Sequence, residues 1–156
     1  MDEQAKRDTL ARAREAVLRL LKFRFRSEKE LWDKLKPKGF SPQTIAQVIQ
    51  YFKDIDLVDD RQFARKWIFA RLAKPFGSGR IRFELKEKGV DPEIIEEELK
   101  EAAKDYSEMD IAAELAQRRA AIYKGLAKEK IKQRLYGYLL RRGFNPQTVM
   151  KVIRKI

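Results

Sequence analysis

The side chains that could do chemistry in this chain are mostly cationic. Its 156 residues include 36 Lys and Arg against 24 Asp and Glu, a formal net charge of +12 at pH 7, with no cysteine and no histidine. The missing residue types exclude disulfides, thiolate nucleophiles, Cys or His zinc sites and imidazole bases, and with them most enzyme constellations. A charge imbalance of this size favours polyanionic partners. The composition therefore predicts a non-catalytic binding protein without metal or cofactor.

The cations are unevenly distributed along the chain. Residues 1–56 carry 13 basic and 9 acidic side chains, residues 57–105 carry 11 of each, and residues 106–156 carry 12 and 4. On helices, several of these cations fall within one sector, away from the apolar residues. One such stripe is often only a solvated face, but three stripes in one basic chain favour a surface that faces a polyanion. The candidate binding residues are Arg12, Arg19, Lys22, Arg26, Arg65, Arg71, Arg80, Arg82, Lys86, Lys130, Arg134, Arg141 and Arg142.

Three other motifs are weaker. The segment Gly77-Ser78-Gly79 resembles a phosphate-binding loop only in its glycines, because the Gly-Lys-Ser/Thr ending is missing, so a loop and helix start is favoured. The pair Asp59-Asp60 is better explained by helix capping than by metal ligation. Aromatic residues could stack on bases, although at helical spacing they more often belong to a core; these are Trp32, Trp67, Tyr136 and Tyr138.

One string of residue types occurs three times, at residues 35–42, 85–92 and 139–146. Each copy begins with leucine and ends with glycine, an apolar residue, Ser, Asp or Asn, and proline. This order predicts a helix that ends at a left-handed glycine and a second helix that begins at once with a polar N-cap and a proline at its first position. The turn residues are Gly39 and Pro42, Gly89 and Pro92, and Gly143 and Pro146. In the first copy Pro37 lies inside the last helical turn, which predicts a kink or an early end.

Apolar residues at a spacing near 3.6 flank every turn and predict two helices per copy. A longer helix should precede each pair, at about residues 5–25, 60–73 and 107–123. Ser27 with Glu30 forms a capping box, and Asp59 caps the second long helix, with Val58 packing on Phe63. We therefore expect an all-α fold of three tandem three-helix repeats, at residues 1–56, 57–105 and 106–156. Units of this size are marginal alone, so we expect neighbours to share apolar faces in an elongated, curved array.

Several segments closely resemble the RecX family of recombination regulators. They are residues 57–68, with Asp59-Asp60-Arg61-Gln-Phe63-Ala64; residues 79–90, with Gly79-Arg80-Ile81; and the Lys/Arg-Gly-Phe/Val turns at Gly39, Gly89 and Gly143. The resemblance covers nearly the whole chain. It implies a cytoplasmic bacterial modulator of the RecA recombinase, which binds the RecA filament on single-stranded DNA in its helical groove and reduces its ATPase, strand-exchange and co-protease activities. It carries over no catalytic residue.

Two other classes remain open. Three-helix units resemble helix-turn-helix domains, whose third helix reads the major groove; here only residues 146–156, with Lys151, Arg154 and Lys155, have suitable cations. Sequence-independent binding of single-stranded or double-stranded DNA is the more general alternative, while a purely protein-binding scaffold leaves the charge of +12 unexplained. The N-terminus lacks the order of a secretory signal and no apolar run is long enough to span a membrane, so a cytoplasmic protein is expected. We also expect it to be a monomer.

Overall fold

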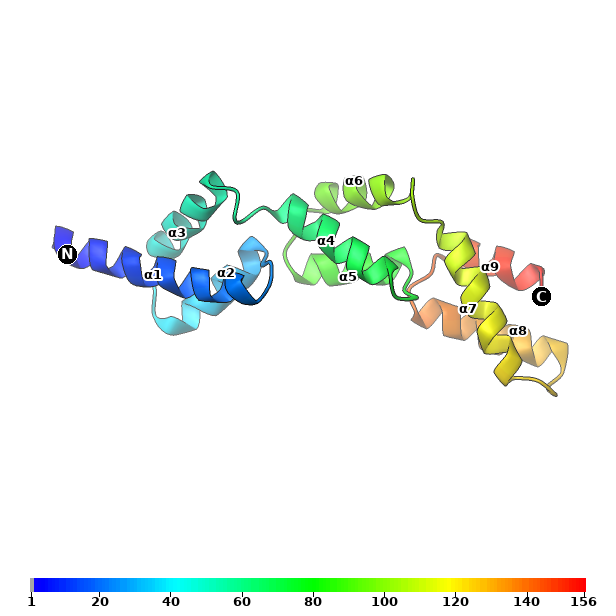
Figure 1. Ribbon diagram of the computed structural model, residues 1–156. Coiled ribbons are helices and arrows are strands. Elements are labelled where there is room, and N and C mark those ends of the chain that lie inside the picture. Colours follow the sequence, from blue (N-terminus) through cyan, green and yellow to red (C-terminus); the bar gives the residue numbers. More distant parts are fainter. Residues whose placement is uncertain (1) are drawn as a thin grey trace.

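The computed structural model describes residues 2–156, and within them the chain is helical without strands. The helices stand in three groups along an extended row, with the N-terminus at one end (Figure 1). The first unit contains α1 (Glu3–Phe23), α2 (Glu28–Leu35), the 3₁₀ helix η1 (Lys36–Lys38) and α3 (Pro42–Asp54). The second contains α4 (Asp60–Leu72), α5 (Ser78–Glu87) and α6 (Pro92–Ala102). The third contains α7 (Glu108–Ile122), α8 (Lys128–Arg141) and α9 (Pro146–Arg154). None of the described helices has the length and apolar character that a membrane crossing requires.

The three repeated turns have the predicted backbone. Gly39, Gly89 and Gly143 adopt φ values of 87°, 76° and 87°, the left-handed region in which a side chain would be strained. Side-chain oxygens then cap the next helix, with Ser41 accepting from the Thr44 N–H at 3.2 Å and Asn145 from that of Gln147 at 2.8 Å. Pro37 acts as expected, because α2 ends at Leu35 and the chain continues as η1.

The caps of the other helices also follow the sequence. Ser27 and Glu30 form a reciprocal capping box at the start of α2, and Asp59 accepts from the N–H groups at the start of α4. The predicted contact between Val58 and Phe63 is wrong. Val58 packs into the core of the first unit, whereas Phe63 belongs to that of the second, because the chain crosses between units at Asp59.

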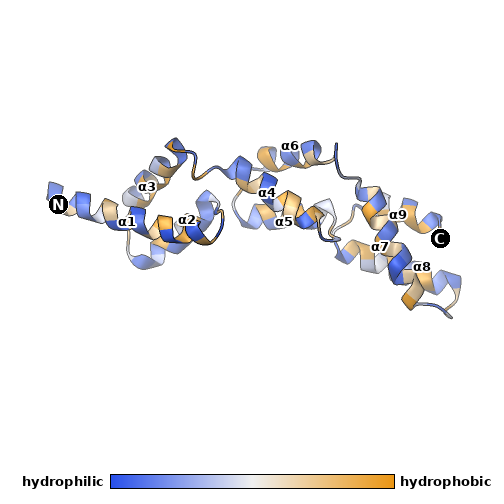
Figure 2. Cartoon of the chain, in the orientation of Figure 1, coloured by the Kyte–Doolittle hydropathy of each residue, from blue (hydrophilic) through white to orange (hydrophobic). Residues whose placement is uncertain are grey.

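Each unit has its own hydrophobic core, so the expectation that neighbours share apolar faces is wrong. The helices carry apolar residues on part of their surface (Figure 2), and the buried ones pack within their own unit. The fully buried residues at the centres are Val17, Leu31, Leu35 and Ile45 in the first unit, Ala64, Ile81, Leu85 and Ile95 in the second, and Ala112, Leu135, Leu139 and Val149 in the third. Other contacts must therefore connect the units.

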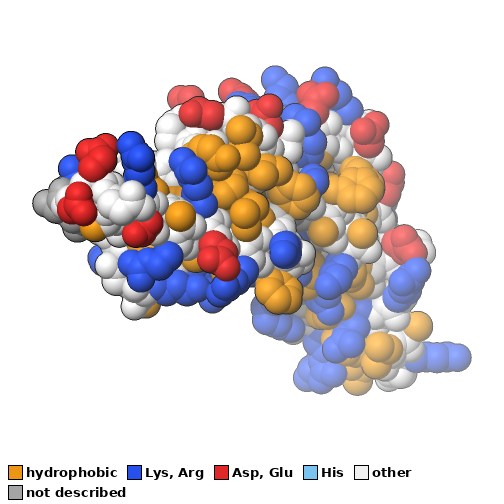
Figure 3. Space-filling view, turned by 60° about the vertical axis from the view of Figure 1, so that its left-hand side comes forward, with side chains coloured by type: hydrophobic (Ala, Val, Ile, Leu, Met, Phe, Trp, Pro, Cys, Tyr) orange, Lys and Arg blue, Asp and Glu red, His pale blue; other side chains and the backbone are white. Residues whose placement is uncertain are grey.

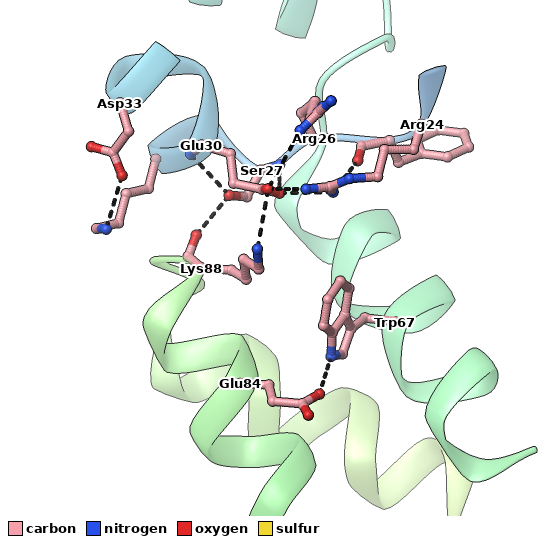
Figure 4. Close-up of polar contacts among 10 residues, drawn as sticks. Arg24, Arg26, Ser27, Glu30, Asp33, Trp67, Glu84 and Lys88 are labelled. Atoms are coloured by element: carbon pink, nitrogen blue, oxygen red, sulfur yellow. Dashed lines mark hydrogen bonds and ion pairs between the residues drawn. The ribbon is translucent and has the colours of Figure 1, made fainter. Parts of the chain in front are cut away.

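The first joint connects the start of α2 to the second unit through polar contacts. The Ser27 hydroxyl donates to the backbone carbonyl of Lys88 at 2.6 Å, and the Glu28 N–H donates to Asp60 Oδ1 at 2.9 Å. The Lys88 ammonium lies 3.3 Å from Glu30, which also pairs with Arg24 (Figure 4). Burial alone would raise the pKa of Glu30, but hydrogen bonds from Arg24 and Ser27 lower it overall. The joint thus depends on donors and acceptors with little exchange of apolar surface.

The second joint repeats this design with main-chain atoms. The Gly77 N–H donates to the Arg142 carbonyl and the Gly79 N–H to the Gly143 carbonyl, both at 2.9 Å. Glu108 accepts from the Ser78 N–H at 3.3 Å. A Cβ on Gly77 would lie 2.3–2.4 Å from backbone atoms of Gly143 and the residue that follows it, so only glycine fits there.

The two joints use equivalent positions. In each, the N-cap residue of the second helix of one unit donates a hydrogen bond to the next unit. The donor is Ser27 or Gly77, and the acceptor is the carbonyl of the residue that precedes the turn glycine of that next unit. In each, the following N–H meets a carboxylate at the first position of the next unit's first helix, Asp60 or Glu108. The internal repeat therefore extends from the units to the contacts between them.

Candidate nucleic-acid interface

The predicted cations of the first unit lie mainly on the exposed face of α1. Arg19 pairs with Glu15 at 2.7 Å, an exposed contact within the helix, and the Arg12 guanidinium lies 6.0 Å from the Phe40 ring. Lys22 is exposed. Arg26 is different, because it is half-buried, its Nη1 lies 3.9 Å from Glu30, and its Nε is buried without a partner among the described residues. Burial lowers its pKa. Arg26 therefore belongs to the interior of the first joint.

The predicted cations of the second unit are largely paired with acids of the same unit. Arg65 donates to both oxygens of Glu98, with bonds of 3.0 and 3.1 Å, and Arg82 pairs with Glu96 at 2.5 Å. Both acids come from α6. The hydrogen bond from Arg65 lowers the pKa of Glu98, whose side chain is buried. The acidic helix α6 thus neutralises cations of α4 and α5, while Lys86 is exposed and has no acidic partner within the described residues.

Glu84 holds two more of these cations. It accepts from Arg71 Nε at 2.8 Å, from Arg80 Nε at 3.2 Å and from the indole N–H of Trp67 at 2.8 Å. Figure 4 shows the Trp67 bond at the edge of the first joint. A carboxylate that accepts three such bonds fixes Trp67 and Arg71 in place, so this part of the second unit is built more for rigidity than for ligand exchange.

The third unit supplies cations without carboxylate partners. Between residues 2 and 156, no ion pair joins Lys130, Arg134, Arg141 or Arg142 to an acidic side chain. Of the nearby acids, Glu108 is engaged in the second joint. Viewed from the N-terminal side, Lys and Arg side chains gather over the distant third-unit end of the molecule (Figure 3). These four cations are therefore available to a polyanion.

Two of these cations, Arg134 and Arg142, lie against aromatic rings in a row that also contains Arg119. Arg142 lies 5.3 Å from the centroid of the Tyr138 ring, and Arg119 lies 4.7 Å from the same ring and 5.7 Å from that of Tyr123. Arg134 follows, 5.5 Å from the Tyr123 ring. We call this alternating set of three arginines and two tyrosines the cation–aromatic chain. Arg119 lies on α7, Arg134 and Tyr138 lie on α8, and Tyr123 and Arg142 directly follow these two helices.

Phe76 extends the cation–aromatic chain across the second joint. Its ring lies 4.1 Å from the Arg80 guanidinium and 5.4 Å from that of Arg142. A pocket of about 370 Å³ opens beside it, lined by Phe76, Arg80, Tyr138, Arg141 and Arg142. Candidate residues of the second and third units, far apart in sequence, thus meet at one place.

The chemistry of this pocket is that of anion and ring recognition. Guanidinium groups bind phosphate oxygens through paired N–H donors, and aromatic rings and guanidinium planes stack on bases. Among the described residues there is no cluster of three metal-ligating side chains. The pocket thus offers guanidinium donors that can bind an anion and rings that can stack on planar groups.

Sequence reasoning omitted three contributors, Phe76, Arg119 and Tyr123. The last two could have been found, because they lie four residues apart on one helix face, as do Tyr138 and Arg142. Phe76 carries no such local signal, since Arg142 is 66 residues away along the chain. Of the aromatic residues considered, Trp32 packs against the first core, Trp67 stacks on Phe63 at 5.7 Å, and Tyr136 is 37% exposed.

Comparison with known proteins assigns the family. Models of the first, second and third three-helix domains of RecX match residues 13–52, 59–99 and 106–153. The regulatory protein RecX of Clostridium beijerinckii is 32% identical over 154 residues, covering 97% of this chain and 71% of the relative. That of Prosthecochloris aestuarii is 34% identical over 137 residues, covering 87% of each. The crystal structure of RecX from Lactobacillus salivarius has the same fold, with a TM-score of 0.87 at 24% identity over 95% of this chain and 96% of that one. The chain therefore belongs to the RecX family.

Proposed function

We propose that this protein is a non-catalytic regulator of homologous recombination and DNA repair, which binds the RecA filament on single-stranded DNA in its helical groove. It inhibits the ATPase, strand-exchange and co-protease activities of that filament. Family membership supports the regulatory role, since the relatives are named regulatory proteins. The extended row of three units suits a surface that runs along a filament (Figure 1). The observation that carries DNA binding is the cation–aromatic chain, whose arginines have no carboxylate partners among the described residues.

The contact with DNA follows from the partners of each arginine. Arg119, Arg134 and Arg142 rest on rings, and a ring holds a guanidinium less strongly than a carboxylate does. A phosphate can therefore bind these arginines without breaking an ion pair, whereas binding to Arg65 or Arg82 would cost their bonds to α6. Bases can then stack on the tyrosines. Neither contact reads a base edge, so binding is independent of sequence.

The salt dependence of binding to an oligo(dT) tests this contact. Each phosphate contact on a single strand contributes about −0.7 to the slope of log K against log salt. Changing Arg119, Arg134 and Arg142 together to Gln should therefore make the slope shallower by about 2. A matched control changes Lys34, Lys36 and Lys100 to Gln, which removes the same charge from exposed cations that lie outside the cation–aromatic chain and have no ion-pair partner among the described residues. An equal decrease in the salt slope in both variants would show that binding depends on overall charge and would refute the interface.

Inhibition of RecA is measured separately, as ATP hydrolysis on single-stranded DNA titrated with this protein. We expect inhibition by the parent and the control variant, and weaker inhibition by the triple Gln variant. No inhibition by the parent at saturation would reject the RecA role and leave a DNA-binding protein. Full inhibition by a triple variant that no longer binds DNA would assign inhibition to contacts with RecA alone.

The helix-turn-helix alternative has one favourable observation. Lys151 and Arg154 are exposed on α9 and, within the described residues, have no acidic partner. The acids of α6, by contrast, would repel DNA at the equivalent helix of the second unit. A strong preference for one duplex sequence, lost on changing Lys151 and Arg154 to Gln, would favour this alternative over RecA regulation.

A further inference from the structure

A second pocket lies at the outer end of the first unit, away from the cation–aromatic chain. It has a volume of about 710 Å³ and opens between the first turns of α1 and the Gly39 turn. Its charged lining consists of Lys6, Arg7, Arg12, Lys38 and Glu3. The four cations have no ion-pair partner within the described residues. Nothing in the proposed DNA contact uses this pocket.

The repeat explains why a pocket lies here. At the two joints, the turn glycine is covered by the preceding unit. A Cβ added at Gly89 would lie 2.5 Å from a side-chain atom of Lys29, and one added at Gly143 would lie 2.4 Å from a side-chain atom of Arg80. At Gly39 no atom outside the turn lies within 4 Å of that position. The Gly39 turn is therefore the same docking surface with no unit placed on it.

The joints also show what such a surface binds. In both, the occupant is the first turn of a helix, whose N-cap donates to the carbonyl before the glycine. The position of the carboxylate differs in the first unit. Thr9 lies four residues before the buried Ala13, as Asp60 lies before Ala64 and Glu108 before Ala112. With a threonine in that place and four cations around it, the pocket favours a helix that brings its own carboxylates.

The charge also argues against a second copy of this chain. The third unit leaves the start of α8 exposed, which is the piece that would continue the series head to tail. Lys128, Glu129 and Lys130 stand there, so this turn carries two cations and one carboxylate, and the docking of one copy on another would bring a net positive turn against the cations of the pocket. Acidic residues, by contrast, are favoured in the first turn of a helix by the N-terminal dipole as well as by the cations of this pocket.

We propose that the pocket at the Gly39 turn is a docking site for the N-terminal turn of an acidic helix from a partner protein. The partner's first N–H and N-cap groups bind the Lys38 carbonyl, as Ser27 binds that of Lys88, and its first-turn carboxylates pair with Lys6, Arg7 and Lys38. The proposal is independent of DNA binding by the third unit.

The test uses the full chain and a defined probe. The probe is a stapled helical peptide with the sequence of residues 27–35, which starts Ser-Glu-Lys-Glu and contains the turn that covers Gly89. Its matched control has both glutamates of the first turn replaced by glutamine. Backbone amide shifts of the labelled protein report binding, and we expect them at Gly39 and Phe40. The glutamine peptide should bind roughly tenfold more weakly.

Two protein variants complete the test. The double variant Arg7→Glu with Lys38→Glu should bind the acidic peptide roughly tenfold or more weakly than the parent. The control variant Lys34→Glu with Lys124→Glu, changed outside the pocket, should bind it with an affinity near that of the parent. Equal binding of the two peptides, or no shift at Gly39 at millimolar peptide, would overturn the proposal. Shifts at Gly39 and Phe40 caused by oligo(dT) but not by the acidic peptide would instead make the pocket a nucleic-acid site. Concentration-dependent dimers that are lost in the Arg7 and Lys38 variant would make a second copy the occupant.

Discussion

Replacing Gly77 by alanine should uncouple the second and third units while leaving both cores intact. Gly77 has φ −85°, so its backbone does not itself require glycine. The obstacle is space, because the new Cβ would meet backbone atoms of Gly143 and Phe144 at 2.3–2.4 Å, and backbone cannot rotate aside as a flexible side chain can. Relief requires the start of α5 to move away from the Gly143 turn.

The cost follows from the contacts that this movement breaks. The Gly77 and Gly79 N–H groups each lose a bond of 2.9 Å to a carbonyl of the third unit, at about 1 kcal/mol per bond. Alanine is also a poorer N-cap than glycine, by roughly 0.5–1 kcal/mol. We therefore expect the free energy that holds the second joint closed to fall by about 2–3 kcal/mol. In native-state hydrogen exchange this appears as a fall of roughly 30- to 150-fold in the protection of the Gly79 amide.

Gly137 provides the matched control, since it lies inside α8 and a Cβ there would meet only the end of the Arg141 side chain at 3.0 Å. Gly137→Ala should stabilise the third unit by roughly 0.5–1 kcal/mol through helix propensity. Unchanged protection of Gly79 in Gly77→Ala, or equal destabilisation by both substitutions, would show that close backbone contact does not hold the second joint.

Two further predictions concern a half-buried and a buried acid. Burial raises the pKa of Asp60 to about 6 from 3.8, so the folded state takes up protons more readily than the unfolded state and this carboxyl lowers stability as pH rises between about 4 and 6. Asp60→Asn keeps an acceptor for the Glu28 N–H and should stabilise the chain by up to about 3 kcal/mol at pH 7.5 but not at pH 4, measured by urea unfolding; a less stable variant at pH 7.5 would mean that the charged form supports the joint. The effect of Glu98 on stability has the opposite sign, because its pKa is lowered in the folded state. The stability that it contributes is present above its unfolded pKa and is lost as pH falls through its folded pKa. Glu98→Gln should therefore cost about 1–2 kcal/mol at pH 7 and little at pH 3 in thermal melts, and a pH-independent cost would assign the effect to packing.

The parts of the fold set by neighbouring residues could be predicted from the sequence. The Gly39, Gly89 and Gly143 turns depend on backbone strain and caps within a few residues, so their chemistry is visible in a single string. The same holds for Pro37, whose ring ends α2 early. Hydrophobic spacing then gives the helices, since each must bury one face.

What connects distant residues could not be predicted in this way. Arg65 and Arg82 belong to a basic stripe in the sequence, but their charges are met by Glu98 and Glu96 on a helix that folds back over them. Gly77 is a loop glycine in the sequence. A side chain is excluded there because the backbone of the Gly143 turn packs against it in the folded protein. Local rules identify where a cation stands, while its partner depends on tertiary packing.

The separation of the three cores bears on how the chain folds as it leaves the ribosome. Each core is assembled from helices that are consecutive in sequence, so packing of one unit need not wait for the next to be synthesised. A nascent chain that has reached residue 105 already contains all residues of the first two cores. Until Arg142 and Gly143 emerge, the Gly77 and Gly79 N–H groups lack their carbonyl partners and are left to water. The start of α5 therefore gains these two hydrogen bonds only after the turn of the third unit has been synthesised, and a pause in synthesis before that point leaves it without them.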